Sequence, residues 1–279
     1  MSKPSKIFRK QNYVSSCDIT VPVQDAQLRV RRYMLPDMDL KRQSVSPTLV
    51  FLHEGLGCVE MWKEFPQRVC SAAKLPGIAY DRQGYGQSSP FVRERKPDYL
   101  HIEAFEYLPA LLTSLGITES ILIGHSDGGT IALLFAGAYQ RQVRSLVTIA
   151  AHVFVEPETV QGIAEARWKY QHSDWPQKLA KYHQDKTDAV FYAWTDTWLS
   201  PEFAEWNIEK ELPNIVSPVL VIQGTGDAFG TAKQVESIVY NTTGPAQPCW
   251  IDDCGHVPYL EKQEEVLEAI CRFIAQRSG

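Results

Sequence analysis

The stretch of residues 121–132 constrains the fold more than any other part of the chain. An apolar run enters a Gly-x-Ser-x-Gly pentapeptide at residues 124–128, and an apolar, Ala-rich segment follows directly. This order predicts a buried strand, a very tight turn with Ser126 at its tip, and a helix. A Cβ atom two residues to either side of Ser126 would collide with the neighbouring strand or helix, and Gly124 and Gly128 avoid that collision. The stretch is therefore typical of a nucleophile elbow.

Apolar runs on both sides of this turn predict that strands and helices alternate. Continuous runs, typical of strands buried on both faces, occupy residues 48–52, 77–80, 144–150, 219–223 and 248–252. Helical spacing is expected over residues 98–115, with a kink at Pro109 and an end at Gly116, and over residues 261–276. Alternating patterns, typical of an antiparallel pair at a sheet edge, occupy residues 14–21 and 27–33. The prediction is an α/β fold with a mostly parallel central sheet flanked by helices.

The alternation stops over residues 153–217, which we expect to form a helical cap inserted after the sixth strand. Residues 1–152 and 218–279 would then form one core domain. The cap segment holds five of the seven tryptophans: Trp168, Trp175, Trp194, Trp198 and Trp206. Each tryptophan alone is best explained by packing between cap and core, but together they predict an apolar cavity.

Charge and composition exclude several classes of protein. The formal net charge is -5 and no block of Lys and Arg is long, so nucleic acid is not expected as a partner. No run approaches the roughly 20 apolar residues of a membrane span. Residues 1–12 lack the apolar core of a secretory signal, which favours a cytoplasmic protein. The six cysteines form no C-x-x-C pair, so we expect reduced thiols and no metal site.

Three loops that follow predicted strands carry Ser126, Asp227 and His256, in that chain order. A serine hydroxyl is a poor nucleophile at neutral pH and needs a base within hydrogen-bond reach. An imidazole suits that role because its pKa lies near the working pH. A carboxylate bound to the far ring nitrogen would fix the tautomer and stabilise the imidazolium. The three residues are therefore a candidate catalytic triad.

Four separated motifs together resemble the α/β-hydrolase family, in its branch of capped serine esterases and meta-cleavage-product hydrolases. They are residues 53–57 (His-Glu-Gly-Leu-Gly), 81–88 (Asp-Arg-Gln-Gly-Tyr-Gly-Gln-Ser), 124–128, and 224–227 with Gly255-His256. The resemblance covers residue 27 to the end of the chain. It implies an oxyanion hole made by the main-chain N–H of Asp127 and by a second N–H, from Gly55 as first choice or Leu56 as second.

Two residues depart from the family pattern. Glu54 stands where the family usually has glycine, so the loop register is shifted and a carboxylate lies near a site for negative charge. That is unfavourable unless Glu54 points away or is paired, and we expect it to point away or to bond the loop backbone. Asp127 follows the nucleophile where a bulky apolar residue is common. Its side chain either orders the loop or contacts a polar substrate.

The remaining polar residues near these motifs have simpler interpretations. We expect His125 to be a packed elbow residue and His53 to anchor its loop. Asp252 lies close to His256 in sequence, but the resemblance favours Asp227 as the acid. Substrate-binding candidates beneath the cap are His152, Trp194 and Trp198.

The sequence thus predicts a serine hydrolase that cleaves a carboxylic ester of a small, apolar or aromatic substrate through an acyl-enzyme on Ser126. No cofactor or metal is implied. Carbon–carbon bond hydrolysis of the meta-cleavage type, lactonase and thioesterase activity are alternatives that use the same triad. A non-catalytic receptor for a small molecule is a further alternative from a different class. The oligomeric state cannot be read from the sequence.

Overall fold

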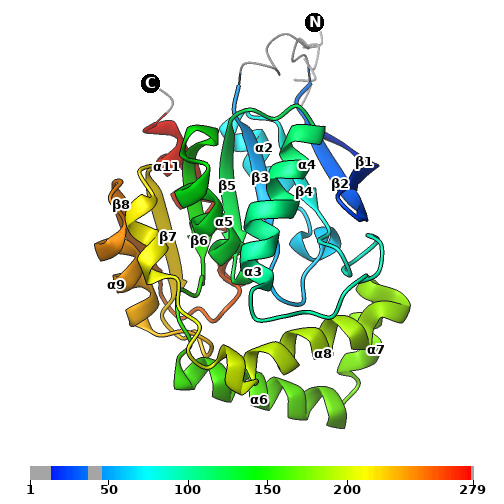
Figure 1. Ribbon diagram of the computed structural model, residues 1–279. Coiled ribbons are helices and arrows are strands. Elements are labelled where there is room, and N and C mark those ends of the chain that lie inside the picture. Colours follow the sequence, from blue (N-terminus) through cyan, green and yellow to red (C-terminus); the bar gives the residue numbers. More distant parts are fainter. Residues whose placement is uncertain (1–13, 37–45, 278–279) are drawn as a thin grey trace, which may run out of the picture.

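The computed structural model describes residues 14–36 and 46–277. Their strands form one eight-stranded sheet (Figure 1). The strands lie in the order β1-β2-β4-β3-β5-β6-β7-β8. Their bounds are β1 Ser15–Val23, β2 Ala26–Met34, β3 Thr48–Leu52, β4 Gly77–Tyr80, β5 Ser120–His125, β6 Val143–Ile149, β7 Val219–Gly224 and β8 Ala246–Ile251. Strand β2 pairs antiparallel with β1 and β4, and all other pairs are parallel. The predicted fold, including the antiparallel pair at the edge, is confirmed.

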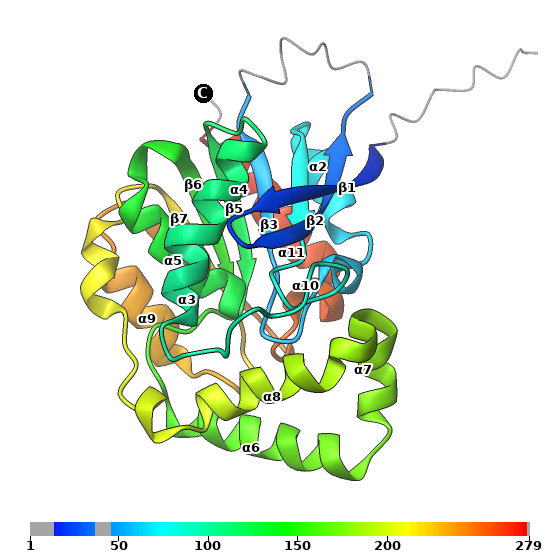
Figure 2. The same cartoon turned by 45° about the vertical axis from the view of Figure 1, so that its right-hand side comes forward.

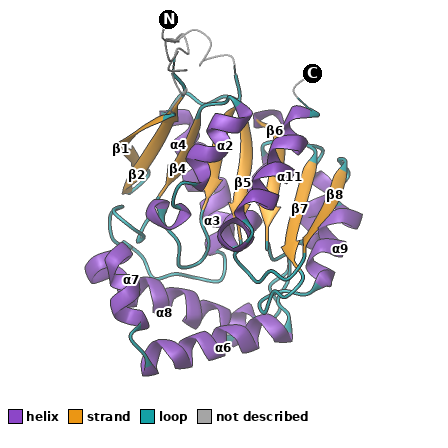
Figure 3. Ribbon diagram, turned by 180° about the vertical axis from the view of Figure 1, so that it is seen from behind, coloured by secondary structure: helices purple, strands orange, loops and turns teal. Residues whose placement is uncertain are grey.

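Helices cover both faces of the sheet (Figures 1 and 3). In β3, Leu49 and Phe51 pack into one apolar core, and Val50 and Leu52 pack into the other. Successive side chains of a strand point to opposite faces, so a strand covered on both sides needs a continuous apolar run. One face is covered by α2 (Phe65–Ala73), α10 (Pro258–Glu261) and α11 (Gln263–Ala275). The other is covered by α3 (Tyr99–Ile102), α4 (Leu108–Ser114), α5 (Asp127–Ala138) and α9 (Ala232–Asn241).

The helix expected over residues 98–115 is interrupted one turn earlier than the predicted kink. A π-helical turn, η2 (Glu103–Tyr107), separates α3 from α4. Pro109 has no N–H to donate to the carbonyl of Phe105, and the hydroxyl of Tyr139 donates to that carbonyl instead, at 3.1 Å. The helix ends as predicted, with Gly116 at φ +68°.

The helix expected over residues 261–276 is α11, which begins two residues later than predicted because the backbone at Lys262 (φ -132°, ψ 50°) is not helical. Glu261 ends α10, and its carboxylate accepts hydrogen bonds from the N–H groups of Gly255 (2.7 Å) and Val257 (3.0 Å). This side chain therefore holds the loop that carries His256.

Three helices connect β6 to β7 and lie across the carboxyl ends of the parallel strands (Figures 1 and 2). They are α6 (Pro157–His172), α7 (Trp175–His183) and α8 (Thr187–Trp198). Aromatic packing joins α6 to α8, since the rings of Tyr170 and Phe191 stack with centroids 3.6 Å apart. Short 3-10 turns complete the fold: η1 Val59–Trp62, η3 Gln140–Gln142, η4 Gln184–Lys186, η5 Pro201–Phe203 and η6 Glu209–Asn214. Among the described residues, no helix is both long and apolar enough to cross a membrane.

Candidate active site

Ser126 lies at the tip of the turn between β5 and α5, with φ 51° and ψ -117°. A residue with a Cβ rarely adopts this conformation, so the backbone is strained there. A Cβ on Gly124 would lie 2.1 Å from the carbonyl oxygen of Gly128, and one on Gly128 would lie 1.9 Å from that of Leu52. The main-chain N–H of Ser126 donates to Ile149 at 2.8 Å. Two glycines and the neighbouring strands thus make the predicted turn possible.

The loops after β7 and β8 bring Asp227 and His256 together. His256 Nδ1 lies 2.9 Å from both Asp227 carboxylate oxygens. The same carboxylate accepts hydrogen bonds from Gln223 Nε2 (2.7 Å) and from the N–H of Phe229 (2.8 Å). Burial raises the pKa of Asp227, but the charge and hydrogen bond of His256 outweigh it and the pKa is lowered. Asp227 is therefore an ionised partner that fixes the His256 ring.

The two loops approach closely because Gly224 has no side chain. A Cβ there would lie 2.3 Å from the carbonyl oxygen of Gly255. Asp252, the alternative acid, is exposed and makes no contact with His256 among the described residues.

Ser126 and His256 line one cavity of about 200 Å³ between the sheet and the inserted helices. The cavity walls also include every other residue predicted for the oxyanion hole or for substrate binding: Gly55, Leu56, Asp127, His152, Trp194 and Trp198. Within the described chain, Ser126 Oγ and His256 Nε2 have no hydrogen-bond partner, and no bond joins them. Hydrogen bonds between catalytic groups are often long without substrate. The structure therefore leaves both reactive atoms free at the same cavity.

Main-chain N–H groups without acceptors lie at the same wall. The N–H groups of Gly55, Leu56 and Asp127 donate to no acceptor in the described part of the chain. Asp127 is the first residue of α5, so the positive end of the helix dipole also faces this region. The ring of Trp194 packs directly on Gly55, where a Cβ would lie 2.7 Å from Trp194 Cδ1.

The Glu54 side chain has a partner that the sequence did not suggest. It lines the cavity, and its Oε2 lies 3.4 Å from Nδ1 of the buried His125. Burial raises the pKa of Glu54, but the hydrogen bond and charge of His125 outweigh it and lower the pKa to about 2. Glu54 is thus ionised and does not point away from the site.

The Asp127 side chain orders the loops around the elbow. Its carboxylate accepts a hydrogen bond from the Tyr99 hydroxyl (3.0 Å) and pairs with Arg82 Nη2 (3.2 Å). Tyr99 in turn accepts from Trp198 Nε1 at 2.9 Å. Of the two roles considered for Asp127, these contacts favour ordering of the loop.

His152 is buried, with Nε2 2.9 Å from the carbonyl oxygen of Phe229. Burial, followed by the charge of His256, lowers the pKa of His152. A neutral ring that donates from Nε2 therefore forms part of the cavity wall.

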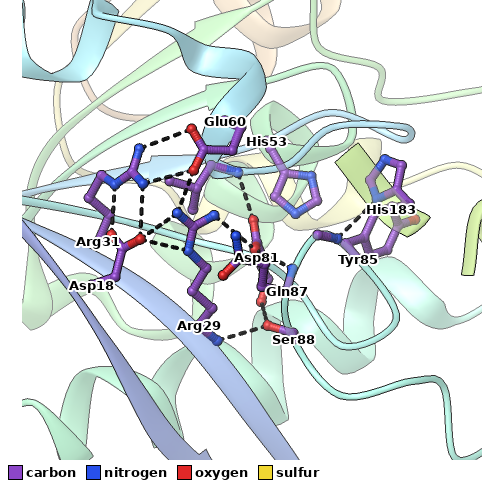
Figure 4. A network of polar contacts seen from close by, with 12 residues as sticks. Asp18, Arg29, Arg31, His53, Glu60, Asp81, Tyr85, Gln87, Ser88 and His183 are labelled. Atoms are coloured by element: carbon purple, nitrogen blue, oxygen red, sulfur yellow. Dashed lines mark hydrogen bonds and ion pairs between the residues drawn. The ribbon is translucent and has the colours of Figure 1, made fainter. Parts of the chain in front are cut away.

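Asp81 fixes the turn after β4 and links it to the loop after β3 (Figure 4). Its carboxylate accepts hydrogen bonds from the N–H groups of Val59 (2.6 Å) and Gln87 (2.8 Å), and Arg29 lies 3.5 Å away. Burial raises the pKa of Asp81, while these neighbours act in the opposite direction. Gly86, at φ +46°, leaves room for the carboxylate, so the turn has the structural role expected of it.

Two histidines join loops in this part of the molecule (Figure 4). His53 accepts the N–H of Arg82 at Nε2 (3.1 Å), and its Nδ1 lies 2.8 Å from the carbonyl oxygen of Glu54. His53 thus anchors its loop, as expected. His183 of α7 accepts the N–H of Gly86 at Nδ1, and its Nε2 lies 2.9 Å from the carbonyl oxygen of Leu56. One inserted helix is thereby attached to both core loops.

Several cavity residues were missed by the sequence reasoning. They are Met61, Thr159, Ile163, Leu179, Phe229 and Val257, together with Glu54 and His125, which were given other roles. Phe229 offered a usable signal, because an apolar ring in the polar loop after Asp227 needs an apolar surface to cover it.

A larger cavity, of about 550 Å³, lies beside α3 and is lined by Arg95, Tyr99 and Glu103 among others. It contains none of the candidate triad residues. Ser126 and His256 both line the smaller cavity, which is therefore the candidate active site.

Comparisons with known proteins give independent evidence on the fold. Residues 47–209 match the model of a family described as alpha/beta hydrolase fold. The mouse serine hydrolase BPHL is 29% identical over 177 residues, which cover 60% of this chain and 58% of that protein. The chain thus spans less than two thirds of that relative.

Two further similarities cover more of the chain. The 2-hydroxy-6-oxo-6-phenylhexa-2,4-dienoate hydrolase of Comamonas testosteroni is 23% identical and covers 72% of this chain and 77% of its own length. The structure of the carboxylesterase CesB from Bacillus subtilis has a TM-score of 0.68 at 21% identity, covering 94% of this chain and 93% of its own. At this identity, the structural likeness shows the fold alone.

Proposed function

Because the chain belongs to the α/β-hydrolase fold family, we propose that it is a serine hydrolase that cleaves a carboxylic ester through an acyl-enzyme on Ser126. One observation carries the proposal. A single cavity is lined by Ser126, by His256 held by Asp227, and by residues whose main-chain N–H groups lack acceptors. These are the parts that acyl transfer requires: a nucleophile, a base and donors for an oxyanion.

In the first half of the reaction, Ser126 Oγ attacks the ester carbonyl carbon while His256 Nε2 takes the hydroxyl proton. The base is Nε2 because Nδ1 is occupied by Asp227. The carbonyl oxygen becomes an oxyanion, which the N–H groups of Asp127 and of Gly55 or Leu56 stabilise. The imidazolium then donates its proton to the departing alkoxide, leaving the acyl group on Ser126.

In the second half, water attacks the acyl carbonyl and His256 Nε2 takes a proton from it. The tetrahedral intermediate collapses, the bond to Ser126 Oγ breaks, and the proton returns to Oγ. The products are an alcohol and a carboxylic acid. No step needs a cofactor or a metal ion.

The cavity supports a small substrate with an apolar or aromatic group. Its volume is about 200 Å³, and its walls are rich in apolar side chains, including Trp175, Trp194, Trp198 and Phe229. Cavities for drug-sized ligands are larger, about 300–1,000 Å³. We therefore expect short acyl groups to be preferred over long ones.

We also propose that residues 153–217 act as a cap that selects the substrate. This segment supplies Thr159, Ile163, Leu179 and the three tryptophans of the cavity wall, whereas the core supplies the proposed triad. The attachment of His183 to Gly86 and Leu56 would hold the cap over the proposed oxyanion loop.

Carbon–carbon bond hydrolysis is a second candidate, favoured by the similarity to the Comamonas testosteroni hydrolase. The bond that breaks would then join the acyl carbon to a carbon leaving group, which must be protonated before or as it departs. The same triad would serve, so substrate tests have to separate the two reactions.

A labelling and turnover experiment tests the proposal. Purified protein is treated with a fluorophosphonate probe and assayed with p-nitrophenyl esters of increasing acyl length and with a meta-cleavage ring-fission product. We expect labelling at Ser126 and fastest turnover of short esters. Preference for the ring-fission product would favour the second candidate, and the absence of both labelling and turnover would refute a hydrolase and favour a small-molecule receptor.

A further inference from the structure

His125 has an unusual pair of neighbours for a buried histidine. It is the last residue of β5 and is fully buried. Its Nδ1 lies 3.4 Å from Glu54 Oε2, and its Nε2 lies 2.7 Å from the carbonyl oxygen of His256. A carboxylate oxygen and a carbonyl oxygen are both acceptors, so an N–H on each ring nitrogen satisfies the two contacts. The geometry therefore fits an imidazolium.

Two other buried histidines nearby provide an internal comparison. His53 and His183 each place one ring nitrogen against a main-chain N–H and the other against a carbonyl oxygen. Each needs one ring proton and is satisfied as a neutral ring. For both residues burial lowers the pKa, which agrees with a neutral ring. Among these three, His125 alone is placed between two acceptors.

Among the described ring contacts of His125, the one group that can carry a competing charge is His256, which becomes positive when it takes the serine proton in the proposed mechanism. The neighbouring rings are Trp62 of η1, Tyr259 of α10 and His256, with centroids 6.4, 5.2 and 5.1 Å away. Burial raises the pKa of Tyr259 well above its usual value, so the phenol is neutral. Glu54 is thus the carboxylate that balances the charge on His125.

Space for this pairing depends on Gly57. A Cβ on Gly57 would lie 2.3 Å from Glu54 Oε2 and 2.6 Å from its carboxyl carbon. The three nearest atoms to that Cβ position all belong to the Glu54 carboxylate, so the glycine makes room for this group. The loop after β3 is shaped to hold the carboxylate against His125.

We propose that Glu54 and His125 form an ion pair that positions the reacting groups by joining the loop of Gly55 and Leu56, the elbow of Ser126 and the main chain of His256. The inference rests on the function proposed above. Glu54 and His125 are positioning residues, since each acts through the main chain or ring of another residue. The pair also cancels the negative charge of Glu54, which would otherwise oppose an oxyanion at this wall.

Histidine NMR tests the ion pair directly, because it counts the ring N–H groups of His125. In protein labelled with ¹⁵N at its seven histidines, we expect His125 to show two ring N–H groups at pH 7, and His53 and His183 to show one each. In Glu54→Gln, which keeps the shape and removes the charge, His125 should show one. Gly57→Ala should also reduce His125 to one ring N–H, although Glu54 and His125 are both unchanged in sequence. The added methyl group would push the Glu54 carboxylate away from the ring. A single ring proton on His125 in the wild-type protein overturns the proposal.

Kinetics test the positioning role. We expect Glu54→Gln and Gly57→Ala to lower kcat by about 10- to 100-fold with KM changed less than about twofold, because misplacement of reacting groups is costly. Asp252→Asn is the matched charge control, since Asp252 is exposed on the loop of His256, and should keep wild-type kcat. An unchanged kcat in both test variants, or an equal loss in the control, overturns the proposal.

The two readouts separate this inference from the proposed function. The ring protons are also measured in Ser126→Ala protein, which needs no turnover. If the proposed function is wrong, the wild-type protein will not turn over esters. If the ion pair is wrong, His125 will show one ring proton in place of two.

Discussion

His256 Nδ1 lies 2.9 Å from each carboxylate oxygen of Asp227. Gln223 and the N–H of Phe229 donate to the same two oxygens, so every hydrogen bond of this carboxylate within the described residues comes from a donor. An amide in its place would direct two N–H donors into a site that offers only donors. The arrangement therefore requires a carboxylate and holds the proton of His256 on Nδ1.

Asp227→Asn is accordingly expected to lower kcat by about 10⁴-fold, the size of the loss when a triad histidine is held in the wrong tautomer. The measurement is turnover of a short p-nitrophenyl ester, with circular dichroism to check the fold. Asp252→Asn, which changes the same charge at an exposed position, should stay within about twofold of wild type. If Asp252→Asn loses the activity and Asp227→Asn keeps it, the acid has been misassigned.

Replacing Ser126 is expected to change both activity and stability, because the residue is the proposed nucleophile and its backbone is strained. Ser126→Ala should lower kcat by about 10³-fold or more, since only the oxyanion donors and substrate binding remain. Ser126→Gly should be equally inactive but more stable than Ser126→Ala by about 1 kcal/mol, because glycine adopts φ 51° without strain. Urea denaturation measures the difference. Equal stability of the two variants would show that the turn is not strained, and retained activity would reject Ser126 as nucleophile.

Much of the fold could be predicted from the sequence because each buried strand must be apolar on both faces. Residues 48–52 form β3 as expected, and the elbow glycines are explained by contacts that only a strand-turn-helix creates. The loops that follow the strands could also be predicted, since parallel strands end at one edge of the sheet. Strand ends therefore predicted that Asp227 and His256 lie at the same edge, whereas the choice of Asp227 over Asp252 came from the family resemblance.

Contacts between distant side chains could not be predicted in the same way. Glu54 and His125 are 71 residues apart, and no periodicity relates them. In the π-helical turn before Pro109, the carbonyl of Phe105 accepts a hydrogen bond from the hydroxyl of Tyr139, the residue that follows α5. Such partners are set by tertiary packing. The motif at residues 53–57 therefore showed that a carboxylate lies near the site, but it did not show that His125 is its partner.

The contact between Gly55 and Trp194 predicts a non-additive pair of substitutions. Gly55→Ala would place a methyl 2.7 Å from the Trp194 ring, so the ring or the loop must move. We expect kcat/KM for a short ester to fall about 10-fold in Gly55→Ala and to recover in part in the double variant with Trp194→Ala, because removing the ring removes the clash. Steady-state kinetics of the four proteins complete the cycle. Strictly additive losses would mean that Trp194 does not press on this loop.

Trp194→Ala alone should widen the substrate range. The ring forms part of the wall of a cavity of about 200 Å³, and its loss makes room for longer acyl groups. The ratio of kcat/KM for octanoyl and acetyl esters should rise by about 10-fold or more, since each added methylene is worth about 0.8 kcal/mol when buried. An unchanged ratio would place the acyl group elsewhere in the cavity.

Glu103 predicts how stability varies with pH. The carboxyl is buried in η2, its Oε2 has no partner among the described residues, and burial raises its pKa to about 7 despite the opposing charges of Arg82 and Arg95. In the unfolded chain the pKa is about 4.3, so between these values the folded state binds the proton and the unfolded state does not. The contribution of Glu103 to the free energy of unfolding is therefore largest below about pH 4.3. It decreases as the pH rises from there and is lost above about pH 7.

Glu103→Gln removes this titration while keeping the shape of the side chain. The free energy of unfolding of the wild type, relative to that of the variant, should decrease by about 2 to 3 kcal/mol between pH 4.5 and pH 8, because each pKa unit corresponds to about 1.36 kcal/mol. Urea denaturation of both proteins across this range measures the change. Curves that stay parallel would mean that Glu103 is ionised in the folded protein at pH 5, and that Arg82 and Arg95 compensate its burial in full.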